Sequence, residues 1–297
     1  MEIIALVQTK MSSDGLCNIQ AIDKDKNQYN LKINFSKSEN ILLDHIYIFD
    51  CDIKAGQRTN YIIKDYKDVY EFKSEKLDEI LRSFIKASPY SYEEGKKIVD
   101  EYINKIDNKV LFDITSYLVN KHHDKFFIYP AAAKMHHAYV GGLVHHCLSM
   151  LKMADAFIEN YEYLDKDYLY SGIILHDIGK SIELDGPLNT SYSKEGMLIG
   201  HLVIGAMEIN DACNKLGYKD KEEALILEHM LISHHGVPQF GAAKKPMTPE
   251  ALALWYIDTI DSKFRVLGDE LENTNEGSFT ENIGVIDKMK IYKPIKD

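Results

Sequence analysis

Histidines are concentrated in one stretch of this chain of 297 residues. Eleven of the twelve fall between residues 122 and 235. They include three adjacent pairs and one His-Asp dipeptide: His136-His137, His145-His146, His234-His235 and His176-Asp177. A single histidine is usually an ordinary surface or core residue. Imidazoles clustered with carboxylates are typical ligands of transition metals, so this pattern predicts a metal site.

The stretch 143–160 has helical periodicity, which distinguishes the two histidines of one pair. His146 lies on the apolar stripe, whereas His145 shares its face with Ser149 and Lys152. A buried imidazole without a partner costs roughly 1 to 3 kcal/mol. We therefore expect His146 to point inward, where a metal ion would satisfy it.

His176 and Asp177 follow the apolar run 169–175, in which Gly172 would let another helix approach closely. Adjacent side chains lie about 100° apart on an ideal helix, but both can reach one ion from a helix end. Lys180 supplies a cation beside them. The arrangement predicts two metal ligands next to a position that suits an anionic phosphate.

Asp258 and Asp261 stand three residues apart on one side of an otherwise apolar segment. Such a pair could form the exposed polar edge of a helix. Together with the histidines, it indicates instead that one of the two aspartates is a ligand. His201, in another apolar stretch, is a further candidate.

The elements that must position these residues change character near residue 72. Residues 1–72 contain short β-type runs, at 3–7, 29–33 and 45–49, separated by polar and glycine-containing turns. This pattern predicts a small β domain, either a five-stranded barrel of the oligonucleotide-binding (OB) kind or another small antiparallel barrel. Its aromatic residues could stack on bases or form the core; they are Tyr29, Phe35, Tyr47, Phe49 and Tyr61.

Helical periodicity begins at Ser74 and continues through most of the remaining chain. It predicts a helical connector over 73–128 and an all-helical domain with a C-terminal tail over 129–297. The expected helices cover 92–106, 109–122, 143–160, 167–178, 195–215, 220–234 and 249–266, and a short strand-like segment follows at 290–292.

Composition limits the class of protein. Hydrophobic residues make up 45% and charged residues 27% of the chain, close to the averages of soluble globular proteins. The four cysteines show no C-x-x-C spacing, which favours a reducing cytoplasm over a disulfide scaffold or a zinc ribbon. Neither a signal peptide nor a membrane span is expected. With a net charge of −11, the protein would need a local basic groove to bind nucleic acid.

Five blocks of sequence resemble the HD-domain metal-dependent phosphohydrolases, most closely the YhaM-type 3'-to-5' exoribonucleases. They occur in the family's order at 136–146, 176–180, 192–201, 232–236 and in a tail with 277–280 and 292–294. The resemblance implies a mainly α-helical protein, with an HD domain preceded by an OB-like barrel. The chain departs from the family pattern at 239–242, which reads Gln-Phe-Gly-Ala, and at Trp255, where a histidine is expected.

The resemblance also implies two divalent ions bridged by Asp177. One ion would be held by His146, His176, Asp177 and Asp258, and the other by Asp177, His201 and His234, with His235 as a ligand or an outer partner. Mn²⁺ is the expected metal, although such ligands also accept Fe²⁺, Co²⁺, Ni²⁺ or Zn²⁺. Two ions about 3.5 to 4 Å apart can stabilise the attacking and leaving oxygens of a phosphodiester.

Further roles follow from the same resemblance. Lys180 would neutralise a phosphate oxygen, and His136 and His137 would position the substrate or protonate the leaving group. Lys244 and Lys245 could bind the backbone of the nucleic acid, or could simply be solvated loop residues. The expected reaction releases 5'-nucleotides from single-stranded RNA, with DNA as the alternative substrate.

Two alternatives remain open at the level of sequence. The chain could be an HD-domain phosphohydrolase of small nucleotides, with the β domain as a lid or an oligomer contact. It could also be a noncatalytic RNA-binding or regulatory module with a structural metal, although such sites are normally closed and need no cation for phosphate. Exposed apolar positions on several helices make a homo-oligomer possible.

Overall fold

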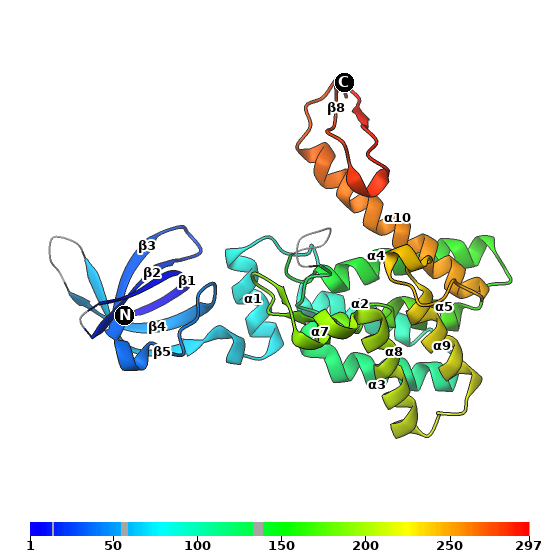
Figure 1. Ribbon diagram of the computed structural model, residues 1–297, viewed down its shortest axis with the longest axis horizontal. Helices are drawn as coiled ribbons and strands as arrows, with labels where there is room; N and C mark the ends of the chain where they lie inside the picture. The colour runs from blue at the N-terminus through cyan, green and yellow to red at the C-terminus, as the bar shows by residue number, and fades with distance from the viewer. Residues whose placement is uncertain (14, 55–58, 133–138, 297) are drawn as a thin grey trace. The chain divides into compact units, whose positions relative to one another are not determined.

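The structure, a computed structural model, describes residues 1–297 except 14, 55–58, 133–138 and 297. The chain forms two compact units, Met1–Ala87 and Ser88–Asp297. The first contains a β-barrel and the second contains most of the helices (Figure 1). The predicted fold class, mainly α-helical with a small N-terminal OB-like barrel, is confirmed.

The barrel consists of five strands whose apolar residues alternate with polar ones. The strands are β1 (Glu2–Ser13), β2 (Leu16–Ile22), β3 (Gln28–Asn34), β4 (Ile46–Lys54) and β5 (Asn60–Asp68). They close in the order β1-β2-β3-β5-β4. The β3–β5 pair is parallel, whereas the other pairs are antiparallel. Alternate side chains such as Ile3, Ala5 and Val7 fill the interior, as the two-residue period of a strand requires.

The aromatic residues of this unit fall into two classes. Tyr47 and Phe49 are fully buried in the barrel core, so they cannot stack on bases. Tyr29 and Tyr61 are partly buried and meet edge to face with their ring centroids 5.3 Å apart. Phe35, in the short helix η1 (Phe35–Lys37), is 47% exposed. A second short helix, η2 (Val69–Glu71), and α1 (Ser74–Phe84) complete the unit.

Nine helices of the second unit lie within the described residues (Figure 1). They are α2 (Tyr92–Ile103), α3 (Lys109–Phe126), α4 (Gly142–Asn160), α5 (Lys166–Leu175), α6 (Lys180–Glu183), α7 (Lys194–Ile199), α8 (His201–Leu216), α9 (Glu222–Ser233) and α10 (Pro249–Glu272). Side-chain caps begin several of them, as at Asn108, Asp165 and Thr248. Small elements lie between some of them: β6 (Leu184–Asp185), β7 (Ser191–Tyr192) and η3 (Pro238–Phe240). Three more follow α10: β8 (Ser278–Phe279), η4 (Gly284–Ile286) and β9 (Tyr292–Lys293).

The buried helix α5 occupies the centre of this unit and contacts α3, α4, α9 and α10. A Cβ atom at Gly172 would lie 2.1 Å from Cε of Met230 in α9. The prediction that Gly172 permits close helix approach is therefore confirmed. As a result, the C-terminal end of α5, which carries His176 and Asp177, lies in the interior of the helical unit.

The expected helix over 195–215 is interrupted. Gly200 has φ +79° and ψ 153°, a conformation that glycine adopts readily and other residues avoid. The chain therefore turns between α7 and α8, and His201 becomes the first residue of α8. None of the helices in the described part of the chain combines the length and apolar character of a membrane span.

Candidate metal centre

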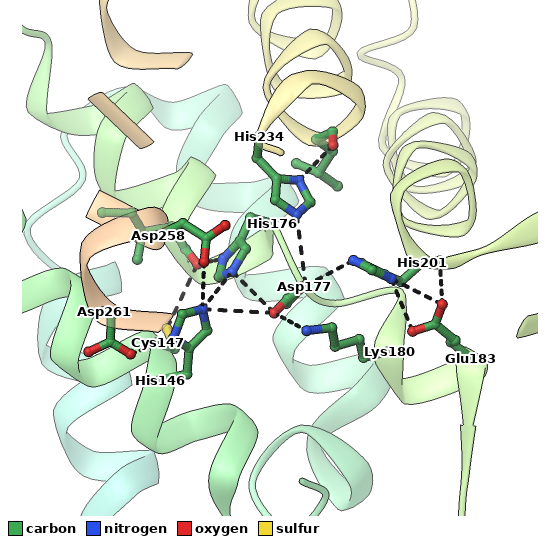
Figure 2. Close-up of polar contacts among 12 residues, drawn as sticks. His146, Cys147, His176, Asp177, Lys180, Glu183, His201, His234, Asp258 and Asp261 are labelled. Atoms are coloured by element: carbon green, nitrogen blue, oxygen red, sulfur yellow. Dashed lines mark hydrogen bonds and ion pairs between the residues drawn. The ribbon is translucent and has the colours of Figure 1, made fainter. Parts of the chain in front are cut away.

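One buried carboxylate, Asp177, lies where several helix ends meet. It follows α5 directly after His176, and both residues are at most 3% exposed. The surrounding histidines come from distant elements: His146 from α4, His201 from the start of α8 and His234 from the end of α9. Figure 2 shows these imidazoles grouped around the carboxylate.

The two oxygens of Asp177 face different groups of side chains. Oδ2 is 3.2 Å from Nε2 of His176 and 2.7 Å from Nζ of Lys180. Oδ1 is 3.5 Å from Nε2 of His201 and 3.9 Å from Nε2 of His234. A carboxylate in this position can bridge two cations.

We call the ligand candidates on the Oδ2 side the first group: His146, His176 and Asp258. Their nearest ligand atoms all lie within 4.8 Å of one another. Nε2 of His146 is 3.2 Å from Oδ1 of Asp258 and 3.3 Å from Nε2 of His176. Nδ1 of His176 is 2.7 Å from the Ile173 carbonyl. Because a carbonyl can only accept, this nitrogen carries the proton and Nε2 is left to face the site.

The second group consists of His201, His234 and His235, which also offer ligand atoms within 4.8 Å of one another. Nδ1 of His234 donates to the Leu231 carbonyl at 2.7 Å, and Nδ1 of His235 donates to the Phe240 carbonyl at 2.7 Å. Each Nε2 is therefore the free position of its ring. Main-chain carbonyls of α9 and η3 thus select the tautomer that suits metal binding.

Three buried atoms, one from Asp177 and two from the second group, fit a cation. Among the described residues, Oδ1 of Asp177, Nε2 of His201 and Nε2 of His234 are buried and have no hydrogen-bond partner. Leaving buried polar atoms unsatisfied costs about 1 to 3 kcal/mol each. Each of these three atoms can donate an electron pair, so a divalent cation would satisfy them together.

The charges of these side chains also suit metal binding. Burial alone would raise the pKa of Asp177, but Lys180 and His176 hold it well below its ordinary value. Burial would likewise raise the pKa of Asp258, which the hydrogen bond with His146 lowers. Burial depresses the pKa of His234 well below its ordinary value. The carboxylates are therefore ionised and His234 is neutral at neutral pH, as metal ligands must be.

Two carboxylates orient the imidazoles through their Nδ1 atoms. The sequence did not predict this role for either of them. Oδ2 of Asp261 is 2.7 Å from Nδ1 of His146, and its other oxygen accepts from the Ser149 hydroxyl. Glu183 accepts from Nδ1 of His201 at 3.0 Å and from the His201 backbone N–H at 3.0 Å. Carboxylates behind metal-ligating histidines fix the ring and raise its basicity. For Glu183 the available signal was the three-residue spacing of Asp177, Lys180 and Glu183.

The other histidines and lysines considered in the sequence differ in burial and in their distance from the metal groups. His146 points inward as predicted and is 1% exposed, but His145 is buried as well, at 9%. Its Nδ1 is 2.6 Å from the Tyr139 hydroxyl, so its polar-face position does not leave it in solvent. Lys244 and Lys245 are exposed and do not line the cavity at the metal groups. His136 and His137 lie outside the described residues.

A cavity of about 510 Å³ opens beside Asp177, within the roughly 300 to 1,000 Å³ typical of ligand sites. Side chains from both groups line it, including His146, His201, His235 and Asp258. Other lining residues extend beyond the metal groups: Phe240, Trp255, Thr259, Ser262 and Lys263. The cavity can therefore hold more than a metal ion and water.

Comparison with known proteins gives a match to one family model and matches to curated proteins. Residues 143–263 match the HD domain family, and this span contains both histidine groups. Twenty-eight curated proteins match the chain. One of them, a 3'-5' exoribonuclease YhaM from Geobacillus sp. (strain WCH70), is 43% identical over 212 residues, which make up 71% of this chain and 65% of that protein. The match thus covers slightly less than two thirds of the relative's length. No solved structure matches the chain.

Proposed function

We propose that the chain belongs to the YhaM-like family of HD-domain proteins and that it is a metal-dependent 3'-to-5' exoribonuclease. The substrate would be single-stranded RNA and the products 5'-nucleotides. The observation that carries this proposal is the pair of histidine groups on either side of Asp177, with buried ligand atoms that lack partners among the described residues.

Two divalent ions would fit this arrangement, with Asp177 as the shared ligand. His146, His176 and Asp258 would complete one site, and His201, His234 and His235 the other. When bound, such ions supply Lewis acidity to phosphate oxygens and activate water at neutral pH. We propose Mn²⁺ as the metal on the basis of the family, although these ligand types also suit Fe²⁺, Co²⁺, Ni²⁺ and Zn²⁺.

The side chains around the ions would prepare the site for an anionic substrate. Lys180 donates one hydrogen bond to Asp177 at 2.7 Å, and an ammonium group has three donors. It can therefore keep Asp177 ionised and also contact a nonbridging phosphate oxygen. Asp261 and Glu183 would hold their imidazoles in the required orientation while the substrate binds.

The barrel provides a second reason to expect a polynucleotide rather than a small nucleotide as the substrate. OB-type barrels commonly bind single-stranded nucleic acid. The net charge of −11 gives no long-range attraction for RNA, so contacts of the barrel and of local lysines such as Lys244 and Lys245 would have to hold the strand.

The direct test is hydrolysis of a 5'-labelled single-stranded RNA with added Mn²⁺. We expect a ladder of labelled products that shortens from the 3' end and that disappears with chelator or with the variant His176→Gln. Immediate release of a labelled mononucleotide would show the opposite polarity and contradict the proposal. Intact RNA together with metal-dependent phosphate release from mononucleotides would instead support a small-nucleotide phosphohydrolase. Inactivity on both substrates in metal-loaded protein would favour a noncatalytic module.

A further inference from the structure

We propose that the cavity beside the metal groups contains a nucleotide subsite, in which Lys263 binds a backbone phosphate and Phe240 stacks on a base. The proposal rests on the proposed function, because it assigns parts of an RNA substrate to side chains near the same metal groups. It concerns residues that none of the five family-like sequence blocks includes.

One face of α10 leads from the metal groups into the rest of the cavity. Residues 255, 258, 259, 262 and 263 all line it. They follow the spacing i, i+3, i+4, i+7, i+8, which places them along one side of a helix. Asp258 is the ligand candidate of this face. Thr259, Ser262 and Lys263 continue this face of the helix, and the Ser262 hydroxyl donates to the Thr259 carbonyl at 3.2 Å. Lys263 is therefore the residue of this face that brings a cation to the cavity.

Lys263 differs from the other lysine of the cavity in its charge balance. Nζ of Lys180 is paired with Asp177 at 2.7 Å. Lys263 is partly buried and, within the described ranges of the chain, forms neither a salt bridge nor a side-chain hydrogen bond. The nearby carboxylate of Asp258 already faces His146 at 3.2 Å. A phosphate group of the substrate is an anion that would balance the charge of Lys263 in this cavity.

Phe240 presents an exposed aromatic ring at the same cavity. Its side chain is 71% exposed, yet its backbone is fixed on both sides. Its carbonyl accepts from Nδ1 of His235 at 2.7 Å, and its N–H donates to the Val237 carbonyl at 3.0 Å. The hydrogen bond that orients a ligand candidate thus also fixes the backbone that carries this ring. A base that stacks on Phe240 would cover apolar surface that otherwise faces water.

Trp255, the other large aromatic residue of the cavity, has a different role. A Cβ atom at Gly236, where φ is +77°, would lie 1.8 Å from Cε2 of the indole. The indole also stacks on Tyr256, with ring centroids 5.0 Å apart. Trp255 is therefore packed beneath the turn that carries His234 and His235, and it acts as a positioning residue.

The test is equilibrium binding of short 5'-labelled RNAs in the presence of Mn²⁺. A methylene group in place of the leaving oxygen in the 3'-terminal linkages prevents cleavage. One RNA is intact, and two others lack the base of the terminal or the penultimate nucleotide. The variants are Phe240→Leu, Phe240→Tyr and Lys263→Gln. Phe279→Leu and Lys219→Gln serve as matched controls, because Phe279 and Lys219 are exposed and lie outside the cavity.

We expect Phe240→Leu to weaken binding of intact RNA by about 5- to 150-fold, the range for loss of one stacked base. One of the two abasic RNAs should bind Phe240→Leu and the unmodified protein with equal affinity, because the base that would stack is missing. Phe240→Tyr should bind intact RNA with the affinity of the unmodified protein. Lys263→Gln should lower the slope of log affinity against log salt by about 0.7, the value for one phosphate contact on a single strand. The two control variants should change neither quantity.

Equal losses on all three RNAs, or an unchanged salt slope in Lys263→Gln, would overturn the subsite. Its failure is distinguishable from failure of the proposed function. If the unmodified protein cleaves ordinary RNA but shows no coupling between Phe240 and a base, only the subsite is wrong. If the unmodified protein neither cleaves nor binds RNA, the proposed function fails and the subsite fails with it.

Discussion

The two histidine groups beside Asp177 have the same number of ligand candidates but different internal contacts. In the first group, His146 contacts both His176 and Asp258. Burial alone would lower the pKa of His146, but hydrogen bonds to Asp258 and Asp261 raise it to about 10. In the second group, Nε2 of His201 and of His234 have no partner among the described residues. A proton therefore satisfies the first group in the absence of metal, whereas the described residues offer these two nitrogens of the second group no partner.

This difference suggests how the two sites are used. An ion that enters the first group has to displace a proton from His146, which makes binding there sensitive to pH. An ion that enters the second group meets His234 and His235, whose Nδ1 atoms donate to main-chain carbonyls, so that each Nε2 presents its lone pair. Asp177 contributes one oxygen to each side, so the two sites are linked through a single residue.

The largest effect is expected from Asp177→Asn, because this change removes the feature that both groups share. The amide has nearly the same shape, but it carries no charge and leaves Lys180 without its partner. We expect activity on RNA to fall by more than the roughly 10- to 100-fold that follows loss of an outer partner of a metal ligand. Metal content should fall in both sites.

The measurement is the rate of RNA cleavage together with metal analysis of the purified protein. Asp220→Asn is the matched control, because Asp220 is exposed in the loop between α8 and α9. Full activity in Asp177→Asn would show that the shared carboxylate does not hold the metals.

Asp261→Asn and Glu183→Gln should separate the two groups. Asp261 orients His146 of the first group, and Glu183 orients His201 of the second. Each variant should therefore weaken only one of two metal-binding steps, by roughly 10- to 100-fold. Calorimetric titration of metal-free protein with Mn²⁺ resolves the steps. If both variants weakened the same step, the division into two groups would be incorrect.

A smaller effect, on stability, is expected from Glu208→Gln in the helix that carries His201. Glu208 accepts hydrogen bonds from Lys121 and His122 of α3. Burial would raise its pKa, but these partners lower it from the ordinary 4.5 to about 2. A carboxylate with a depressed folded-state pKa stabilises the protein above its unfolded-state pKa, and this contribution is lost as the pH falls towards the folded-state value.

We therefore expect Glu208→Gln to reduce the free energy of unfolding by about 1 to 3 kcal/mol at neutral pH. The difference from the unmodified protein should shrink as the pH falls from 4.5 towards 2. Urea denaturation across this pH range measures it. A difference that stayed constant with pH would mean that the charge of Glu208 contributes nothing to stability.

Local patterns in the sequence predict much of the fold and part of the site. The alternation in 1–72 and the helical period from Ser74 reflect which side chains each element buries, and both are local properties. The inward direction of His146 follows from the apolar stripe on its own helix. The role of Gly172 follows from its position in a continuous apolar run, where only a closely packed neighbour gives a glycine an advantage.

Contacts between distant segments account for what the sequence does not reveal. His146 and Asp261 are 115 positions apart, so their hydrogen bond has no local signature. The break at Gly200 depends on a backbone conformation that neighbouring residue types do not specify. Lys180 is paired with Asp177, whereas Lys263 has no salt bridge to any residue that the structure describes. This contrast becomes visible only when α6 and α10 are placed around one cavity.

The most direct test of the central claim, two ions that share Asp177, is a titration of metal-free protein with Mn²⁺ followed by EPR spectroscopy. The structure predicts two bound equivalents, and the second should convert the spectrum of an isolated ion into that of a spin-coupled pair. In Asp177→Asn the coupling should disappear. One equivalent at saturation, or two equivalents whose spectra remain those of isolated ions, would contradict a carboxylate-bridged pair of sites.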